Sequence, residues 1–191
     1  MILNDHEIRE LAEQGMIVPF VPEKIRKVDD IAAISFGASS YGYDLRLAAD
    51  QFKSFRHVPG TVINPKRFNP QNLQDEQLCT DEDGSFFIAR HHSYSLAYVY
   101  ERLRIPPDIT VLFIGKSTYA RCGIIVNTTP GEAGWQGHLT LEISNSAEAD
   151  VRIYAMEGIC QALFFRGNPC LNPYGAGKYQ DQVAGVTLAR V

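Results

Sequence analysis

The chain has 191 residues, of which 45% are hydrophobic and 21% are charged, and this composition excludes an intrinsically disordered chain. Its 18 Lys and Arg residues against 22 Asp and Glu residues give a net charge of -4, which disfavours a broad nucleic-acid-binding surface because such surfaces carry a basic excess. No apolar run approaches the ~20 residues that a membrane-spanning helix needs, and the first residues lack a signal-peptide pattern. We therefore expect a soluble, cytoplasmic protein with neither nucleic acid nor a membrane as its partner.

The first predicted element is a helix that starts after Asn4. Asn4 is a favourable N-cap, and Glu7 stands three residues later as its capping-box partner. Leu3 and Ile8 can form the hydrophobic staple that often accompanies such a cap. Gly15 then provides a natural end for the helix.

Short runs rich in Val, Ile, Phe and Tyr follow, separated by turn residues. They predict strands over residues 43–47, 86–89, 95–100, 110–114, 123–126, 138–144, 151–154 and 159–165. The polar residues 64–84 are predicted to form a long loop or an arm. Many short strands with few helical stretches favour a mainly β fold, an antiparallel barrel or jelly roll, and we expect residues 1–191 to form one domain.

A dense group of polar residues begins where the strand at 110–114 ends. Ser117 is predicted to cap a short helix that ends at Gly123, and a helix N-terminus binds phosphate readily. Lys116 and Arg121 would add positive charge to such a site. The alternative is a capped turn with two solvated cations.

Residues 138–144 alternate between apolar and polar side chains, which places Glu142 on the polar face of a strand. In a partly buried pocket a glutamate can act as acid and base in turn; otherwise Glu142 is a solvated strand residue. Trp135, the single tryptophan, precedes this strand and either stacks on a sugar or base or fills the core.

The C-terminal segment mixes aromatic, amide and glycine residues. It can fold over a ligand, or it can be a frayed end. If it closes, the residues available to a nucleotide are Tyr174, Lys178, Gln180 and Gln182.

The cysteines and histidines give no sign of a disulfide or of a zinc site. The cysteines form no CxxC pair and the histidines show no HExxH spacing. We expect all four cysteines, which are Cys79, Cys122, Cys160 and Cys170, to be buried free thiols.

Four segments of the chain resemble the dCTP deaminase family: SSYGYDLR at 39–46, GKSTYARCGIIVN at 115–127, GHLTLEISN at 137–145 and GKYQ at 177–180. The resemblance implies a distorted β-barrel or jelly roll of the dUTPase-like type, with a short N-terminal helix and small peripheral helices. It also implies a homotrimer with active sites between subunits. The implied reaction is the hydrolysis of dCTP to dUTP and ammonia, which supplies dUMP for thymidylate synthesis.

The resemblance also assigns roles to individual residues. Glu142 is similar to the general acid/base, and Ser117 to the serine that holds the attacking water together with a backbone carbonyl at about Pro130. The implied substrate-binding residues are Lys116, Ser117, Thr118, Tyr119, Ala120 and Arg121 for phosphate and base, Glu132 and Trp135 beside the deoxyribose, Thr140, Leu141 and Glu142 for the cytosine, and Gln161, Tyr174, Lys178 and Gln182 for the triphosphate.

The expected ligands are dCTP with Mg²⁺ bound to its triphosphate, and dTTP as an inhibitor. No metal site on the protein is expected. Zinc-dependent cytosine deaminases need a Pro-Cys-x-x-Cys sequence, but Cys170 is followed by Leu171, Asn172 and Pro173 with no second thiol. If the chain deaminates cytosine, it therefore has to do so without zinc.

Three other functions remain open from the sequence. The chain can be a bifunctional enzyme that also cleaves dUTP to dUMP and pyrophosphate, or a plain dUTPase, although it shows no clear glycine-rich, arginine-bearing tail. It can also be a catalytically silent nucleotide-binding regulator. The presence of Glu142 with Ser117 and Arg121 argues against the regulator, because binding alone needs no proton shuttle.

Overall fold

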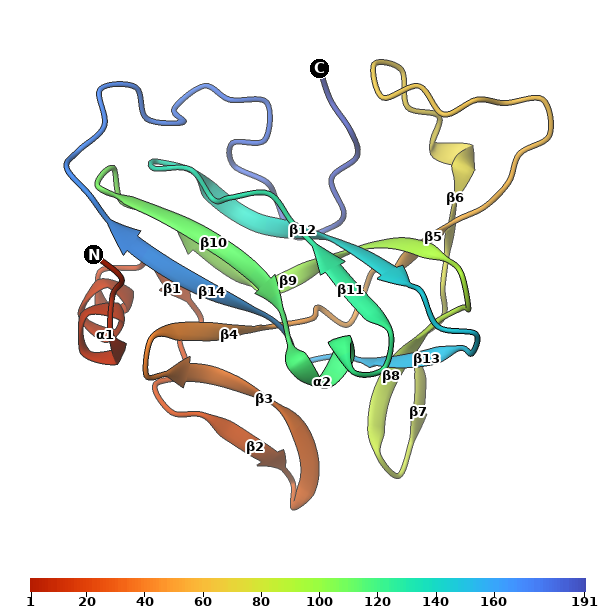
Figure 1. The fold of residues 1–191 in the computed structure, drawn as a ribbon, viewed down its shortest axis with the longest axis horizontal. Coiled ribbons are helices and arrows are strands. Elements are labelled where there is room, and N and C mark those ends of the chain that lie inside the picture. The colour runs from red at the N-terminus through yellow and green to blue at the C-terminus, as the bar shows by residue number, and fades with distance from the viewer.

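Antiparallel strands are the main regular elements of the computed structural model, which describes residues 1–191 (Figure 1). The helical elements are few and lie at the periphery: α1 (Asp5–Glu13), the 3-10 turn η1 (Pro70–Asn72) and α2 (Ser117–Ala120). None of these helices has the length and apolar character required to cross a membrane.

The strands form three separate sheets. The largest has the order β11-β12-β9-β5-β6, with β1 attached to β9, and consists of β1 (Ile17–Val18), β5 (Lys53–Phe55), β6 (Leu73–Asp75), β9 (Tyr94–Arg104), β11 (Ile124–Asn127) and β12 (Gln136–Asn145). The second has the order β10-β14-β4-β3-β2 and consists of β2 (Ile25–Val28), β3 (Ile31–Ser39), β4 (Gly42–Arg46), β10 (Ile109–Gly115) and β14 (Gly158–Arg166). The third has the order β13-β8-β7 and consists of β7 (Cys79–Asp81), β8 (Gly84–Ala89) and β13 (Val151–Tyr154).

The mainly β class and the distorted fold predicted from the sequence are confirmed, although the sheets do not close into a barrel, and every predicted strand is present. The sequence missed β1, β2, β3 and β5, and also β6 and β7 within the segment 64–84. That segment is not a plain loop, because it contains η1, β6 and β7. These strands escape a pattern search because they are short and polar, or, as in β3, rich in Ala, Ser and Gly, which have low strand propensity.

Helix α1 has the predicted N-terminus. The Glu7 amide donates to Oδ1 of Asn4 over 3.0 Å, and the Asn4 amide donates to Oε2 of Glu7 over 3.2 Å, which completes the capping box. Gly15 follows with φ of 89°, a left-handed conformation that glycine adopts without strain. Ile8 and Ala12 are buried, so the apolar face of the helix joins the core.

The prediction for the cysteines was correct only for Cys160. All four are free thiols, but Cys79, Cys122 and Cys170 are exposed. Cys79 begins the edge strand β7, Cys122 follows α2, and Cys170 follows β14. None of these positions faces the core, whereas Cys160 lies inside β14 and is fully buried.

The core is a cluster of 32 buried residues supplied mainly by the strands, with α1, α2 and connecting segments adding the rest. Strand β12 contributes to it with every second side chain: Leu139, Leu141 and Ile143 are buried, while the residues between them are only partly buried. The predicted alternation is therefore present, and it holds Glu142 on the opposite face from the core.

One buried ion pair joins the two larger sheets. Nε of Arg46 on β4 lies 2.7 Å from Oε1 of Glu101 on β9, and the Arg46 amide donates to Oε2 over 2.9 Å. The Glu101 side chain is 0% exposed and that of Arg46 is 12% exposed. The guanidinium also lies over the rings of Phe36 and Tyr100, at 5.0 and 4.7 Å from their centroids. Burial raises the pKa of Glu101, and its hydrogen bonds to Arg46 offset part of that effect.

We expect Arg46→Met to lower the free energy of unfolding by about 3–5 kcal/mol, because it leaves the buried Glu101 carboxylate without a partner. Arg152→Met is the matched control. Arg152 also pairs with a carboxylate, Asp81, and lies over an aromatic ring, Phe86, but its side chain is 43% exposed. Arg152→Met should lower the free energy of unfolding by less than about 1 kcal/mol. Urea unfolding of both variants at one protein concentration measures the difference, and equal losses would show that burial of the Arg46 pair contributes nothing.

Candidate active site

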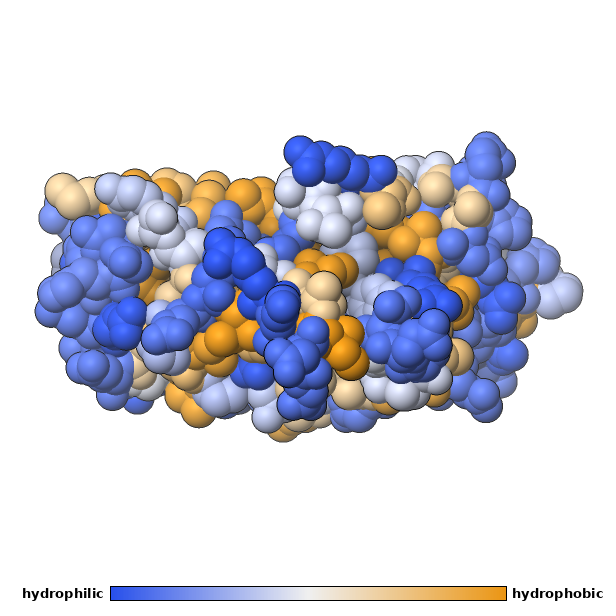
Figure 2. Space-filling view, turned by 90° about the horizontal axis from the view of Figure 1, so that it is seen from below, coloured by the Kyte–Doolittle hydropathy of each residue, from blue (hydrophilic) through white to orange (hydrophobic).

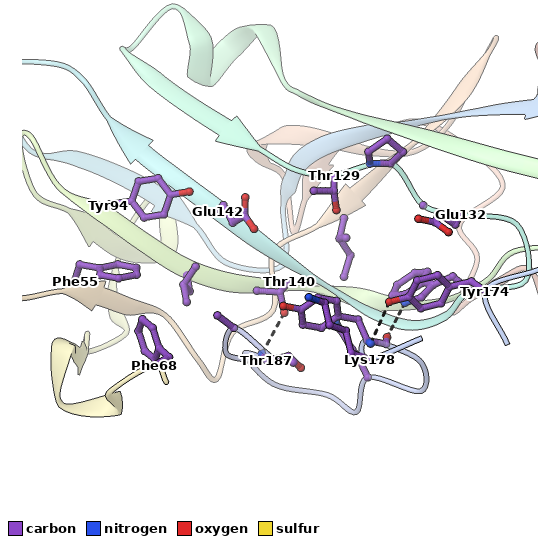
Figure 3. Close-up of a pocket in the computed structure, with 18 residues that line it drawn as sticks. Phe55, Phe68, Tyr94, Thr129, Glu132, Thr140, Glu142, Tyr174, Lys178 and Thr187 are labelled. Carbon is purple, nitrogen blue, oxygen red and sulfur yellow. Dashed lines mark hydrogen bonds between the residues drawn. The ribbon is translucent and has the colours of Figure 1, made fainter. Parts of the chain in front are cut away.

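A cavity of about 550 Å³ lies between strand β12, the segment 129–135 and the C-terminal tail, residues 167–191 (Figure 3). Its size is typical of sites for small molecules and cofactors. The residues that line it are Phe55, Phe68, Tyr94, Leu96, Thr129, Pro130, Gly131, Glu132, Trp135, Leu139, Thr140, Glu142, Tyr174, Lys178, Tyr179, Gln182, Thr187 and Ala189.

Glu142 is the half-buried carboxylate of this cavity. It lies opposite Asn127 of β11, whose Nδ2 donates a hydrogen bond to Oε2 of Glu142 over 3.2 Å. Burial raises the pKa of Glu142, and the bond from Asn127 lowers it in part. A carboxyl group with a raised pKa can both accept and donate a proton near neutral pH, which is the property that acid/base catalysis requires.

The segment 129–135 forms one wall of the cavity and is fixed at Gly131. The Val111 amide donates to the Gly131 carbonyl over 2.9 Å, and the Gly131 amide donates to the Val111 carbonyl over 2.8 Å. A Cβ atom at Gly131 would lie 3.0 Å from Cε2 of Phe113, so this close approach favours glycine. The bonds hold Pro130 and Glu132 on the cavity wall.

Trp135 fills part of the core, which is one of the two alternatives that the sequence left open, and it also reaches the cavity. Its indole N–H donates to the Tyr179 carbonyl over 2.8 Å, so it anchors the C-terminal tail as well.

The tail folds over the cavity and is not a frayed end. Its amides bind the rest of the chain at both ends: the Tyr174 amide donates to the Ala133 carbonyl over 2.8 Å, and the Thr187 amide donates to Oγ1 of Thr140 over 3.1 Å. Lys178 is the only cationic side chain that lines the cavity. The tail therefore brings one positive charge to the site.

Gln182 and Gln180 have different surroundings in the tail. Gln182 lines the cavity, and its Oε1 is buried without a hydrogen-bond partner. Gln180, by contrast, does not line the cavity. Its side chain accepts a hydrogen bond from the Gln136 amide and donates one to the Gly134 carbonyl, which makes it part of the tail's attachment.

The structure adds an aromatic cluster that sequence reasoning missed. Phe55, Phe68 and Tyr94 lie at the end of the cavity beyond Glu142, as seen from Lys178 (Figure 3). The Phe55 ring meets the other two edge-on, with centroid distances of 5.9 Å to Phe68 and 5.5 Å to Tyr94. These residues come from separate segments, and no motif marks any of them.

The predicted site residues fall into two groups. A first group lines the cavity: Glu132, Trp135, Thr140, Glu142, Tyr174, Lys178 and Gln182. A second group lies outside it: Lys116, Ser117, Thr118, Tyr119, Ala120, Arg121, Leu141 and Gln161. The side chain of Leu141 is in the core, and Nε2 of Gln161 donates to Oγ of Ser39 over 3.1 Å.

Residues 116–121 form the turn around α2, which lies at the far ends of β10 and β11 from the tail (Figure 1). The prediction that Ser117 caps this helix was wrong. Ser117 is its first residue, Lys116 takes the cap position, and no side chain makes a capping hydrogen bond. The helix was predicted to end at Gly123, but α2 ends at Ala120, and Gly123, with φ of 80°, follows at the end of the turn.

Metal ligands do not gather anywhere in the structure. No group of three or more His, Cys, Asp or Glu side chains is arranged to hold a metal ion.

Comparison with known proteins identifies the family. Residues 2–167 match the family model described as dCTP deaminase-like. The dCTP deaminase of Acidovorax sp. (strain JS42) is 48% identical over 99% of this chain and 98% of its own length, and that of Granulibacter bethesdensis is 48% identical over 100% and 99%.

A solved structure supports the fold alone. The crystal structure of 2'-deoxycytidine 5'-triphosphate deaminase from Agrobacterium tumefaciens matches with a TM-score of 0.56 at 19% identity, over 90% of this chain and 49% of that one. This chain thus spans about half the length of that protein. The family match and the near-full-length similarity to the two relatives together show that the chain belongs to the dCTP deaminase-like family.

Proposed function

We propose that the chain is a dCTP deaminase, which hydrolyses dCTP to dUTP and ammonia. The observation that carries the proposal is the half-buried Glu142 on the cavity wall, with its raised pKa, in a chain 48% identical to proteins named dCTP deaminase. The mainly β fold alone would not distinguish this function from others, because one fold can carry many activities.

In the proposed reaction Glu142 moves protons and forms no covalent bond. Its carboxylate takes a proton from water as the water oxygen attacks C4 of the cytosine, and it delivers that proton to N3. It then transfers the second hydrogen of the former water to the amino nitrogen as the C4–N bond breaks, so that ammonia leaves and a carbonyl remains at C4. The Pro130 carbonyl and the Ser117 hydroxyl are proposed to hold the water.

The cavity supports one orientation of the nucleotide. The base is proposed to lie at Glu142 and Thr140, because the reacting carbon has to meet the carboxylate. The triphosphate, with its Mg²⁺, then extends towards Lys178, the cation of the cavity, with Tyr174 and Gln182 beside it. Glu132 and Trp135 remain for the deoxyribose.

The deamination is proposed to proceed without zinc. The support comes from the residues themselves, because Cys170 has no second thiol near it in sequence and lies exposed on the tail. Water activation then depends on Glu142 and on fixed hydrogen-bond acceptors. The inhibition by dTTP and the cytoplasmic location stay predictions of the sequence.

We also propose that the active site is completed by a second copy of the chain, in a homotrimer. One chain brings only Lys178 to a triphosphate, whereas Ser117, Thr118 and Arg121 are exposed on a turn outside its own cavity. Exposed apolar side chains near that turn give further support: Leu112 and Ile114 of β10 and Ile125 of β11 are 45%, 48% and 56% exposed. Figure 2 shows a face of the molecule with apolar patches in its middle and hydrophilic residues at both ends.

Product analysis tests the proposed reaction. Pure protein incubated with dCTP, Mg²⁺ and a zinc chelator should release equal amounts of dUTP and ammonia and no pyrophosphate. Glu142→Gln should fold normally and bind dCTP but lose ~10²–10⁴-fold in turnover, because it cannot carry the proton. Formation of dUMP and pyrophosphate would instead establish the bifunctional enzyme, and tight dCTP binding without any product would establish the silent regulator.

The hydrogen bond from Asn127 should set the acidic limb of the pH–rate profile. The free enzyme needs Glu142 as a carboxylate, so kcat/KM should fall as the pH drops through the pKa of Glu142. Since the bond from Asn127 lowers that pKa, Asn127→Ala should raise it and move the acidic limb to higher pH, by up to ~1 unit for one hydrogen bond to a charged group. Ser144→Ala, on the same face of β12, is the control and should leave the limb in place. If the acidic limb does not move in Asn127→Ala, the pKa that it reports belongs to a group other than Glu142.

Subunit complementation tests the shared site. Glu142→Gln and Arg121→Ala should each be inactive alone. Their co-expression should restore roughly a quarter of the wild-type rate, because random mixing gives about one site in four an intact Glu142 from one subunit and an intact Arg121 from its neighbour. Co-expression that stays as inactive as the single variants would show that one chain holds the whole site. Sedimentation of the wild-type protein gives the subunit number independently.

A further inference from the structure

We infer that Lys116 is a positioning residue, which fixes the α2 turn through Asp44, and that it is not a ligand of the triphosphate. This inference rests on the proposed function, because it concerns how the exposed side chains of α2 are held ready for the neighbouring subunit's cavity. It departs from the role that the family resemblance gives to Lys116.

The side chain of Lys116 points into the protein. Its Nζ lies 2.7 Å from Oδ2 of Asp44 on β4 and 3.2 Å from Oγ of Ser35 on β3. The side chain of Lys116 is only 10% exposed and that of Asp44 only 2% exposed. An ammonium group in these surroundings is already paired and hydrogen-bonded, so binding a phosphate would mean leaving a buried carboxylate.

Sheet order explains why the lysine has to cross a strand. Lys116 follows β10 directly, and β10, β14, β4 and β3 are consecutive neighbours in their sheet. The aliphatic part of Lys116 therefore passes over the start of β14, where the residue is Gly158. A Cβ atom at this position would lie 3.0 Å from Cδ of Lys116 and 2.0 Å from the carbonyl oxygen of Ser35. Glycine thus leaves the space through which the lysine reaches Asp44.

The turn needs such an anchor because α2 cannot hold itself. It has four residues and no side-chain cap, and a helix of one turn is unstable by itself. Tyr119 provides the second anchor: its side chain is buried, and its hydroxyl accepts a hydrogen bond from the Tyr154 amide over 2.8 Å. With these two side chains directed inward, the exposed residues of the turn are Ser117, Thr118, Ala120 and Arg121.

The chain contains a matched control for Lys116. Lys24 also pairs with Asp44, with its Nζ 3.0 Å from the same Oδ2, and its side chain is 31% exposed. It lies just before β2 and is not part of the α2 turn. Loss of either lysine leaves Asp44 with the other as its partner, so each single variant keeps one ion pair and should fold.

Hydrogen exchange of the nucleotide-free protein tests the inference without any assay of activity. In Lys116→Met the amides of Ala120, Arg121 and Cys122, which donate hydrogen bonds within the turn, should exchange at least ~10-fold faster than in the wild type, because the turn opens more often. In Lys24→Met they should exchange at the wild-type rate. Equal exchange in the two variants, whether both fast or both slow, would overturn the positioning role.

Steady-state kinetics with dCTP gives the second readout. If Lys116 acts by positioning, Lys116→Met should lower kcat at saturating dCTP, Lys116→Arg should recover part of the loss, and Lys24→Met should stay within about twofold of the wild type. If Lys116 instead binds the triphosphate, Lys116→Met should raise KM and leave the exchange of the free protein unchanged, which would overturn the inference. A wild-type protein that does not deaminate dCTP would refute the proposed function, while the exchange experiment would still decide the role of Lys116.

Discussion

Two buried charges on strand β4 connect the parts of this protein. Asp44 and Arg46 are two residues apart, so they lie on the same face of the strand, while Tyr43 and Leu45 enter the core from the other. Arg46 reaches Glu101 and joins the two larger sheets, and Asp44 reaches Lys116 and holds the α2 turn. The carboxylates of Asp44 and Glu101 are almost fully excluded from water, so Glu101 depends on Arg46 for compensation and Asp44 depends on its two lysine partners. The segment 43–46 thus connects the core, the junction of the two larger sheets and the α2 turn.

The cavity gains its chemistry from segments that are far apart in the chain. Strand β12 offers Glu142, the segment 129–135 forms one wall, and the tail closes another. None of these parts alone would take Glu142 out of water. Their assembly produces the partial burial that raises its pKa, and Asn127 limits the rise with a single hydrogen bond. The reactivity proposed for the carboxyl group is therefore a property of the folded chain, not of the glutamate itself.

The sequence was sufficient for two strong local patterns. The capping box of α1 and the alternation of β12 were readable because both depend on neighbours within a few residues, and the position of Glu142 followed from the alternation. Contacts between distant segments were not readable. The meeting of Phe55 with Tyr94 and the pairing of Lys116 with Asp44 depend on sheet order, which the sequence did not reveal. A lysine beside a serine and an arginine looks like an anion ligand until the strand beneath it is known.

The attachment of the tail also gives the protein an optical property. The chain has one tryptophan, and its indole N–H holds the carbonyl of Tyr179 at the edge of the cavity. Indole emission responds to hydrogen bonding and to contact with water, and here all of it arises from this one position. The ultraviolet fluorescence of the unmodified protein is therefore a reporter of whether the tail is closed, free of any background from other tryptophans.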